Sequence, residues 1–141
     1  MQELLSAFSR DADFQSIVSG LRSGMKEQLI SGLSGSSKGV MISALAAEMK
    51  APLLVLTHNM FSAQKIVEDL VECLPEEQIL LFPAQEILSA EAAAASPEML
   101  AQRIEALTRL ASGYRGVVVA PFAAVRKLLP NKEMFVHALC L

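Results

Sequence analysis

Apolar residues in this chain alternate between short unbroken runs and longer stretches with helical spacing. The runs expected to form strands are Leu29–Ile30, Leu53–Leu56, Ile79–Phe82, Val117–Ala120 and Phe135–Leu141. Runs that are apolar without alternation are typical of parallel strands buried on both faces. The sequence therefore predicts a three-layer α/β fold, with a parallel sheet of about five strands and helices on both faces.

Helical patterns occupy the stretches between these runs. Two short ones open the chain, and the second is expected to begin after a cap at Asp11 or Asp13. Ser96-Pro97-Glu98 supplies an N-cap, a first-turn proline and a first-turn acid for a helix that should end at Gly113. Its apolar stripe predicts the inward residues Leu100, Ile104, Leu107 and Ala111. Further helices are expected over 40–50, 63–74 and 123–129.

Residues 32–39, Gly-Leu-Ser-Gly-Ser-Ser-Lys-Gly, resemble a phosphate-binding P-loop with two parts replaced. The pattern G-x-x-x-x-G-K-[ST] needs its second glycine so that backbone N–H groups can close around phosphates. Its lysine meets the phosphate charge, and its final hydroxyl holds Mg²⁺. Gly32 and Lys38 are in place, whereas Ser37 stands at the second glycine and Gly39 at the hydroxyl. An apolar pair before the loop and a helical pattern after it fit the usual setting.

Both replacements are expected to remove chemistry. A Cβ at Ser37 lies where the backbone must approach phosphate, and a positive φ there costs on the order of 1 kcal/mol. Gly39 offers no Mg²⁺ ligand, on which phosphoryl transfer depends. We therefore predict no catalytic residue, cofactor or metal, and a vestigial phosphate loop that comprises Gly32, Gly35, Ser36, Ser37, Lys38 and Gly39. Weak anion binding at the helix N-terminus, helped by Lys38, is the open alternative.

Composition narrows the class of protein. The chain has 141 residues, of which 52% are hydrophobic, enough for one domain with a core. No apolar run approaches the roughly 18 residues of a membrane span, and the first residues lack signal-peptide features, so a cytoplasmic protein is expected. A net charge of −3 with scattered charges gives no basic footprint for nucleic acid. Cys73 and Cys140 lack metal-ligand spacing and are interpreted as reduced structural thiols.

The remaining polar candidates are interpreted as structural. His58 has no Asp, Ser or Cys in a recognisable catalytic arrangement and is expected to be a polar residue at a strand end. His137 lies in an apolar run and is expected in the core or at a sheet edge. Two basic pairs are interpreted as solvated helix faces rather than a DNA track: Arg103 with Arg109, and Arg126 with Lys127.

Several segments together resemble a known family. Leu33–Lys38 occupies the P-loop position of helicases, Leu54–Gln64 is similar to motif Ia of the excision-repair helicase UvrB, and Val117–Val125 lies where motif Ib falls. Ser96–Arg103 fits the phrase S-P-E-x-x-A-Q-R of Gram-positive transcription-repair coupling factors. Over nearly its whole length the chain therefore resembles the N-terminal UvrB-like domain of the bacterial transcription-repair coupling factors, the Mfd family.

The resemblance implies a degenerate P-loop NTPase or helicase-like fold, like domain 1a of UvrB. It implies a helical segment at 1–25 and an α/β domain at 26–141. The chain ends within an apolar run, so the domain is expected to be truncated at its C-terminal end. Pro83–Ser96 contains no aromatic residue and is not expected to form the damage-reading hairpin of UvrB.

The resemblance also implies a role within a larger protein. Members of the family release RNA polymerase stalled at DNA lesions with a C-terminal translocase that uses ATP and Mg²⁺, and they recruit the repair protein UvrA. UvrA is gripped mainly by the following domain, while other domains contact RNA polymerase and DNA. This segment would then be a non-catalytic interaction and regulatory scaffold that packs against the rest of its parent protein, without membrane contact.

Two other functions are also compatible with the sequence. One is a nucleotide-dependent P-loop enzyme fragment, such as a small kinase or a helicase-like ATPase. The other is single-stranded DNA binding along the carboxyl edge of the sheet. The loops expected to share that edge are Gly32–Lys38, Thr57–Asn59, Pro83–Glu86 and Pro121–Phe122.

Overall fold

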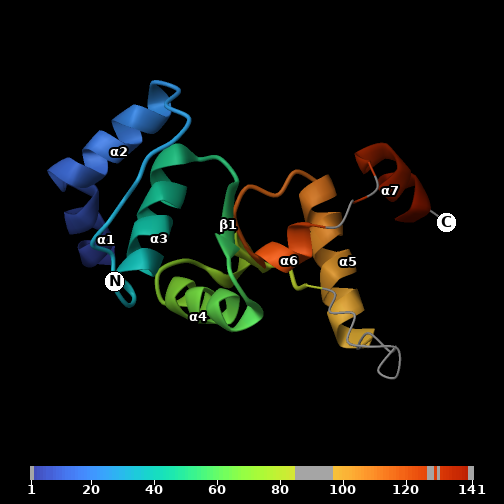
Figure 1. The fold of residues 1–141 in the computed structure, drawn as a ribbon. Coiled ribbons are helices and arrows are strands. Elements are labelled where there is room, and N and C mark those ends of the chain that lie inside the picture. Colours follow the sequence, from blue (N-terminus) through green and yellow to red (C-terminus); the bar gives the residue numbers. More distant parts are fainter. Residues whose placement is uncertain (1, 85–96, 127–128, 130, 140–141) are drawn as a thin grey trace.

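The computed structural model describes residues 2–84, 97–126, 129 and 131–139. In it, a small sheet lies between helical layers (Figure 1). The helices and strands in chain order are α1 (Gln2–Ser9), α2 (Ala12–Arg22), α3 (Ser37–Met49), β1 (Leu53–Thr57), α4 (Met60–Val71), a 3₁₀ turn (Glu76–Gln78), β2 (Ile79–Leu81), α5 (Pro97–Ala111), β3 (Val117–Pro121), α6 (Phe122–Val125) and α7 (Lys132–Leu139).

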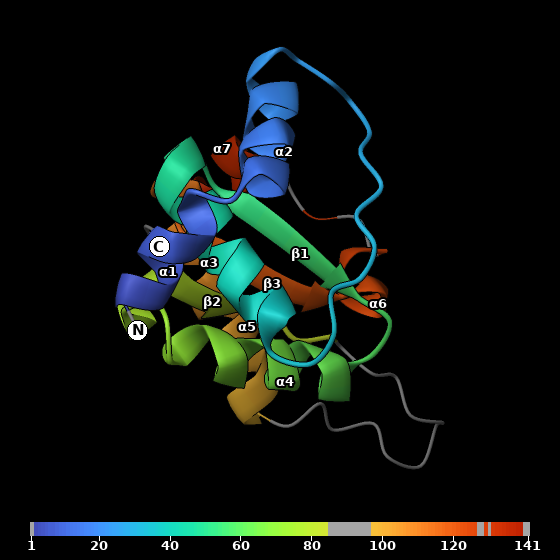
Figure 2. The same ribbon diagram turned by 90° about the vertical axis from the view of Figure 1, so that its left-hand side faces the viewer.

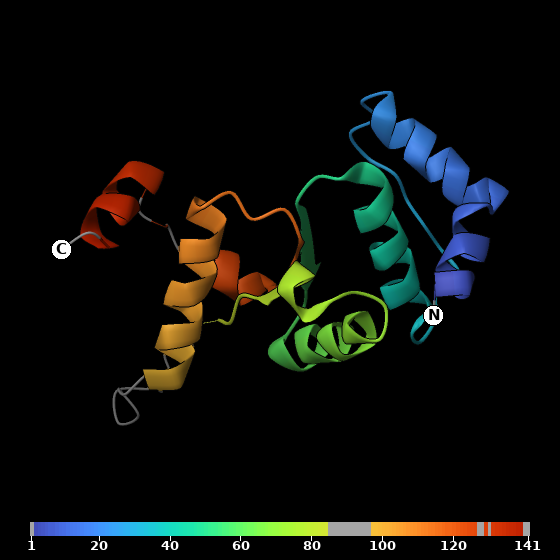
Figure 3. The same ribbon diagram turned by 180° about the vertical axis from the view of Figure 1, so that it is seen from behind.

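The sheet consists of three parallel strands in the order β1-β3-β2. Strand β3 is central and pairs with β1 along its whole length and with β2 over Val117–Val119. Helices α3 and α4 cover one face, and α5 and α6 cover the other (Figure 3). All five residues of β3 are buried as a result. The predicted three-layer α/β architecture is confirmed, with three strands rather than five among the described residues.

Two of the five predicted strands are wrong. Leu29–Ile30 lies in an irregular segment between α2 and α3 (Figure 2), where Leu29 is 97% exposed and Ile30 lines a cavity instead of joining a ladder. Two apolar residues bury too little surface to pin a strand that has no partner. Of Phe135–Leu141, the part up to Leu139 belongs to α7, because Asn131 Oδ1 accepts a hydrogen bond from Met134 N and caps a helix of good helix formers. Residues 140–141, including Cys140, lie outside the described residues.

Helix boundaries follow the local signals closely. Asp11 caps α2, with its carboxylate accepting hydrogen bonds from Asp13 N and Phe14 N. Gly113, at φ +87°, follows the end of α5 as expected. The predicted cap at Ser96 lies outside the described residues.

The first two helices pack on the outer side of α3. Phe14 and Val18 of α2 form a buried cluster with Ala44 of α3, and the Phe8 ring lies 5.3 Å from that of Phe14. On the surface, Arg22 forms an ion pair with Glu48 at 3.0 Å. Most of the stability of this layer comes from the aromatic cluster, because exposed ion pairs contribute little.

The buried face of α5 contains Arg103, whereas Leu100 and Ile104, which were expected to face the core, are exposed. Leu100 and Ile104 are 47% and 43% exposed, whereas Arg103 is only 8% exposed. The prediction that Leu100 and Ile104 face inward is therefore wrong, and so is the interpretation of Arg103 as a solvated residue.

The buried Arg103 joins three elements. Its guanidinium donates hydrogen bonds to Pro83 O at 2.8 Å and Ala124 O at 3.2 Å, and it lies 4.1 Å above the Phe82 ring. Burial lowers the pKa of this guanidinium from its ordinary value, yet two carbonyl acceptors and a ring face compensate the charge. The side chain thus fastens the end of β2 and the start of α6 to α5.

Tyr114 carries an uncompensated hydroxyl in the turn before β3. Its oxygen is buried and makes no hydrogen bond with another described residue, while Arg109 lies 4.7 Å from the ring centre. Burial raises the pKa of Tyr114, and the charge of Arg109 opposes this rise only in part. A pKa raised by folding means stability that is present below the unfolded value of about 10 and is lost as pH rises through the folded value.

We expect Tyr114→Phe to raise the free energy of unfolding at neutral pH by about 1 kcal/mol, because it removes an unsatisfied buried hydroxyl and keeps the ring. The variant should also lose less stability than the natural chain between neutral and strongly alkaline pH. Urea unfolding at both pH values measures the two effects. A variant less stable than the natural chain at neutral pH would show that the hydroxyl has a partner.

Candidate functional site

The vestigial phosphate loop leads into α3 through two glycines in the left-handed region. Gly32 and Gly35 have φ values of +86° and +51°. Among the described non-glycine residues only Lys50 has a positive φ, so Ser37 sits in an ordinary conformation as the first residue of α3. The expected backbone strain at Ser37 is therefore wrong, because Gly35 makes the turn instead.

The Ser37 hydroxyl closes this loop on itself. It donates a hydrogen bond to Ser34 O at 2.6 Å and accepts one from Ser34 N at 2.9 Å. A working phosphate loop presents such backbone N–H groups to its ligand. Here the N–H group of Ser34 is already satisfied by the protein.

A carboxylate from α4 lies beside the start of α3. Asp69 Oδ1 accepts a hydrogen bond from Ser36 Oγ at 3.0 Å. A negative charge near the first turn of a helix complements its dipole, which is also the position that a phosphate takes in an NTPase. Asp69 therefore adds negative charge where a bound phosphate would need positive charge.

Gly39 is buried where α3 crosses α4. A Cβ built on Gly39 would lie 2.7 Å from Asp69 Cβ and 3.4 Å from the Asp69 carbonyl carbon. Contacts below 3.0 Å force a shift of the neighbouring atoms. The glycine in the position of the Mg²⁺-binding hydroxyl is therefore required by helix packing, and a serine or threonine does not fit there without movement.

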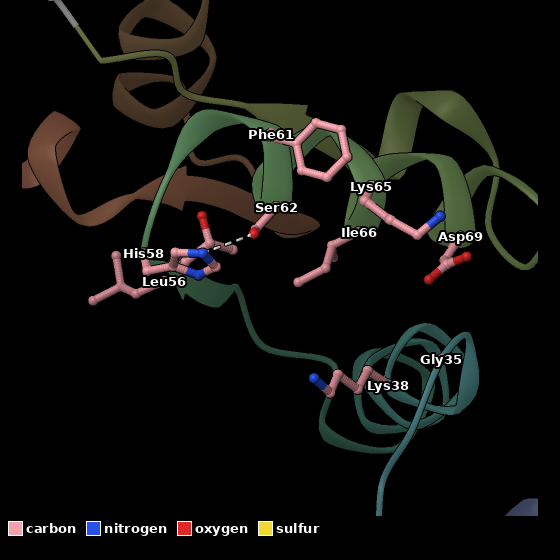
Figure 4. A pocket seen from close by; sticks show the side chains of 10 residues that line it. Gly35, Lys38, Leu56, His58, Phe61, Ser62, Lys65, Ile66 and Asp69 are labelled. Carbon is pink, nitrogen blue, oxygen red and sulfur yellow. Dashed lines mark hydrogen bonds between the residues drawn. The ribbon is translucent and has the colours of Figure 1, made fainter.

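A cleft of about 440 Å³ opens between the start of α3 and one side of α4, at the carboxyl end of β1 (Figure 4). Its polar lining includes Lys38, His58, Ser62, Lys65 and Asp69, and its apolar lining includes Leu56, Phe61 and Ile66. The structure thus brings the glycine loop and the loop after β1 to one edge, as the sequence predicts for a parallel sheet. Glu86, expected at the same edge, lies outside the described residues.

Lys38 and Lys65 are free cations in this cleft. Within the described part of the chain neither side chain makes a hydrogen bond or an ion pair. Sequence reasoning selected Lys38 but missed Lys65 and Asp69. Their spacing of four residues places them on one side of α4, yet nothing in the sequence shows that this side meets α3.

His58 has a neighbour that sequence reasoning did not assign. Its Nε2 lies 3.4 Å from Ser62 Oγ; His58 is exposed and Ser62 is half-buried. The preceding Thr57 hydroxyl donates to Asn59 O at 2.9 Å and shapes the loop after β1. Within the described residues no group of three His, Cys, Asp or Glu side chains could hold a metal ion.

Comparison with known proteins shows what the chain is similar to. No protein-family model matches the chain. The transcription-repair-coupling factor of Bacillus subtilis is 44% identical over 135 residues, which is 96% of this chain and 12% of that protein. This chain is homologous to a segment of the transcription-repair-coupling factors. The counterpart from Staphylococcus aureus strain USA300 is 33% identical over 89 residues, or 63% of this chain and 8% of that protein.

The predicted family resemblance is confirmed by these relatives. The chain spans only a small part of the length of each, so their names describe much larger proteins. In the part of the chain that the structure describes, no helix is both long enough and apolar enough to cross a bilayer.

Proposed function

We propose that this chain is a non-catalytic, UvrB-like interaction segment of a transcription-repair-coupling factor, in which the phosphate loop has become a packing joint between α3 and α4. The observation that carries the proposal is the contact between Gly39 and Asp69. Homology supports the family, and the geometry of the loop supports the absence of nucleotide chemistry.

Two parts of a nucleotide site are lost here: one backbone donor is bonded within the protein, and the metal ligand is absent. Phosphoryl transfer needs backbone N–H groups around the phosphates, a cation, and a metal ligand. The N–H group of Ser34 bonds to Ser37, and position 39 has no room for a hydroxyl-bearing side chain. The Asp69 carboxylate offsets part of the positive charge that a triphosphate would need, so Lys38 alone is left of the original set.

The proposal extends to the protein of which this segment would be a part, by analogy with the transcription-repair-coupling factors. The parent protein would release RNA polymerase stalled at DNA lesions, driven by an ATP- and Mg²⁺-dependent motor elsewhere in its sequence, in the cytoplasm. It would recruit UvrA mainly through the domain after this one. The present segment would contribute contacts to the rest of its parent and to partners, as scaffold and regulator.

Titration with Mg-ATP separates this proposal from a nucleotide-dependent enzyme. We expect isothermal titration of the chain with Mg-ATP to show no saturable binding up to about 1 mM, because the Ser34 and Ser37 N–H groups are bonded within the loop and position 39 offers no metal ligand. The matched control is Lys38→Ala, which should behave like the natural chain. Micromolar binding that requires Mg²⁺ and disappears in Lys38→Ala would defeat the proposal.

A further inference from the structure

The cleft between α3 and α4 combines exposed apolar side chains with two lysines that have no ion-pair partner among the described residues. Phe61, in the first turn of α4, is 73% exposed, and Leu56 of β1 is 49% exposed. Both line the same cleft as Lys38 and Lys65 (Figure 4). Large apolar side chains that are exposed together and rimmed by charges are typical of surfaces that bind another protein.

The charge of the cleft is opposite to that of the whole chain. Its two lysines, Lys38 and Lys65, outnumber the one carboxylate in its lining, Asp69, which accepts a hydrogen bond from the Ser36 hydroxyl. The chain as a whole has a net charge of −3. A local basic site on an acidic surface attracts carboxylates selectively and repels strongly anionic polymers at longer range.

We propose that this cleft binds an acidic segment of a protein partner, with an apolar anchor side chain between Leu56 and Phe61 and carboxylates on Lys38 and Lys65. This inference rests on the proposed interaction role and adds to it a face and a partner chemistry. The cleft volume of about 440 Å³ lies in the range of ligand-binding clefts in proteins.

Single-stranded nucleic acid fits the same cleft less well. Non-specific strands are held by a long basic groove and by several aromatic platforms. Here two lysines and one phenylalanine line the cleft, beside the Asp69 carboxylate. Leu56 and Ile66 complete an aliphatic wall, which suits a leucine-like anchor better than a base.

The test uses the whole 141-residue chain and a fluorescein-labelled peptide of glutamates around a central leucine-phenylalanine pair. We expect the amide NMR signals of Lys38, Phe61 and Lys65 to shift on titration. Lys65→Glu should weaken the binding measured by anisotropy about tenfold, and Phe61→Ser should do so to a similar degree. Lys26→Glu, an exposed charge reversal outside the cleft, is the matched control and should leave the affinity unchanged.

Three results would overturn the inference: no binding at millimolar peptide, binding that Lys65→Glu does not change, or an oligothymidylate that binds the same residues more tightly than the peptide. The last result would identify a nucleic-acid surface. Circular dichroism of each variant checks that it is folded. A negative result with the peptide does not change the expected result of the Mg-ATP titration, so failure of this inference is distinguishable from failure of the proposed function.

Discussion

Replacing Arg103 by methionine is expected to lower the free energy of unfolding by about 3 kcal/mol. The change removes two charge-assisted hydrogen bonds, to Pro83 O and Ala124 O, and the contact with the Phe82 ring. It also leaves two carbonyl groups without their donor in a buried place, while methionine keeps much of the side-chain volume. Urea denaturation followed by circular dichroism measures the loss.

Two variants calibrate this expectation. Arg109→Met removes a single exposed hydrogen bond, to Glu77 O, together with a contact to the Tyr114 ring, and should cost only about 1 kcal/mol. Arg103→Lys keeps the charge but offers one ammonium group to carbonyls that the planar guanidinium reaches separately, so most of the loss should persist. Equal losses for Arg103→Met and Arg109→Met would refute the role of Arg103 as a joint between β2, α5 and α6.

Gly39→Ser restores the hydroxyl of the P-loop motif, yet we expect it to destabilise the chain by about 2 kcal/mol without creating Mg²⁺ binding. The new Cβ would lie 2.7 Å from Asp69 Cβ, so α3 and α4 must move apart. Gly39→Ala should cost a similar amount, because the clash arises from Cβ and not from the hydroxyl. Chemical denaturation of both variants measures this.

A double-mutant cycle identifies the clashing partner. Asp69→Gly removes the opposing Cβ and costs about 1 kcal/mol by itself, as glycine does inside a helix. Combined with Gly39→Ala it should recover part of the loss, with a coupling energy of at least about 1 kcal/mol. Strictly additive losses would mean that the two helices do not meet at this point.

The sequence was sufficient for the parts of the fold that rest on local signals. Leu53–Leu56, Ile79–Phe82 and Val117–Ala120 are four-residue apolar runs between polar loops, and all three contribute to the sheet. Leu29–Ile30 and Phe135–Leu141 do not form the predicted strands, because an apolar run can equally belong to a loop or a helix. Contacts with other parts of the folded chain determine which structure such a run adopts.

The orientation of α5 could not be read from its pattern. A stripe of apolar residues predicts the buried face only when the neighbouring layers are wholly apolar. Here the carbonyl oxygens of Pro83 and Ala124 face α5 and accept hydrogen bonds from Arg103, so this side of the helix packs against the core. Leu100 and Ile104 are exposed to solvent as a result, and the hydrophobic pattern of the helix alone does not predict this.

The candidate site shows the same division. The glycine loop and Lys38 were found from the sequence, because the motif is local. The motif shows only that Gly39 lacks the Mg²⁺-binding hydroxyl. The structure gives a reason for glycine at this position, because a Cβ there would clash with Asp69. Asp69 lies 33 residues from its partner Ser36, and this separation gives no sequence signal.

A crystal structure of the chain grown with Mg²⁺ and a non-hydrolysable ATP analogue tests the central claim most directly. We predict that no triphosphate is ordered at the start of α3, and that Asp69 keeps its hydrogen bond to Ser36. A triphosphate lying along Ser34–Lys38, with Asp69 displaced, would contradict the account.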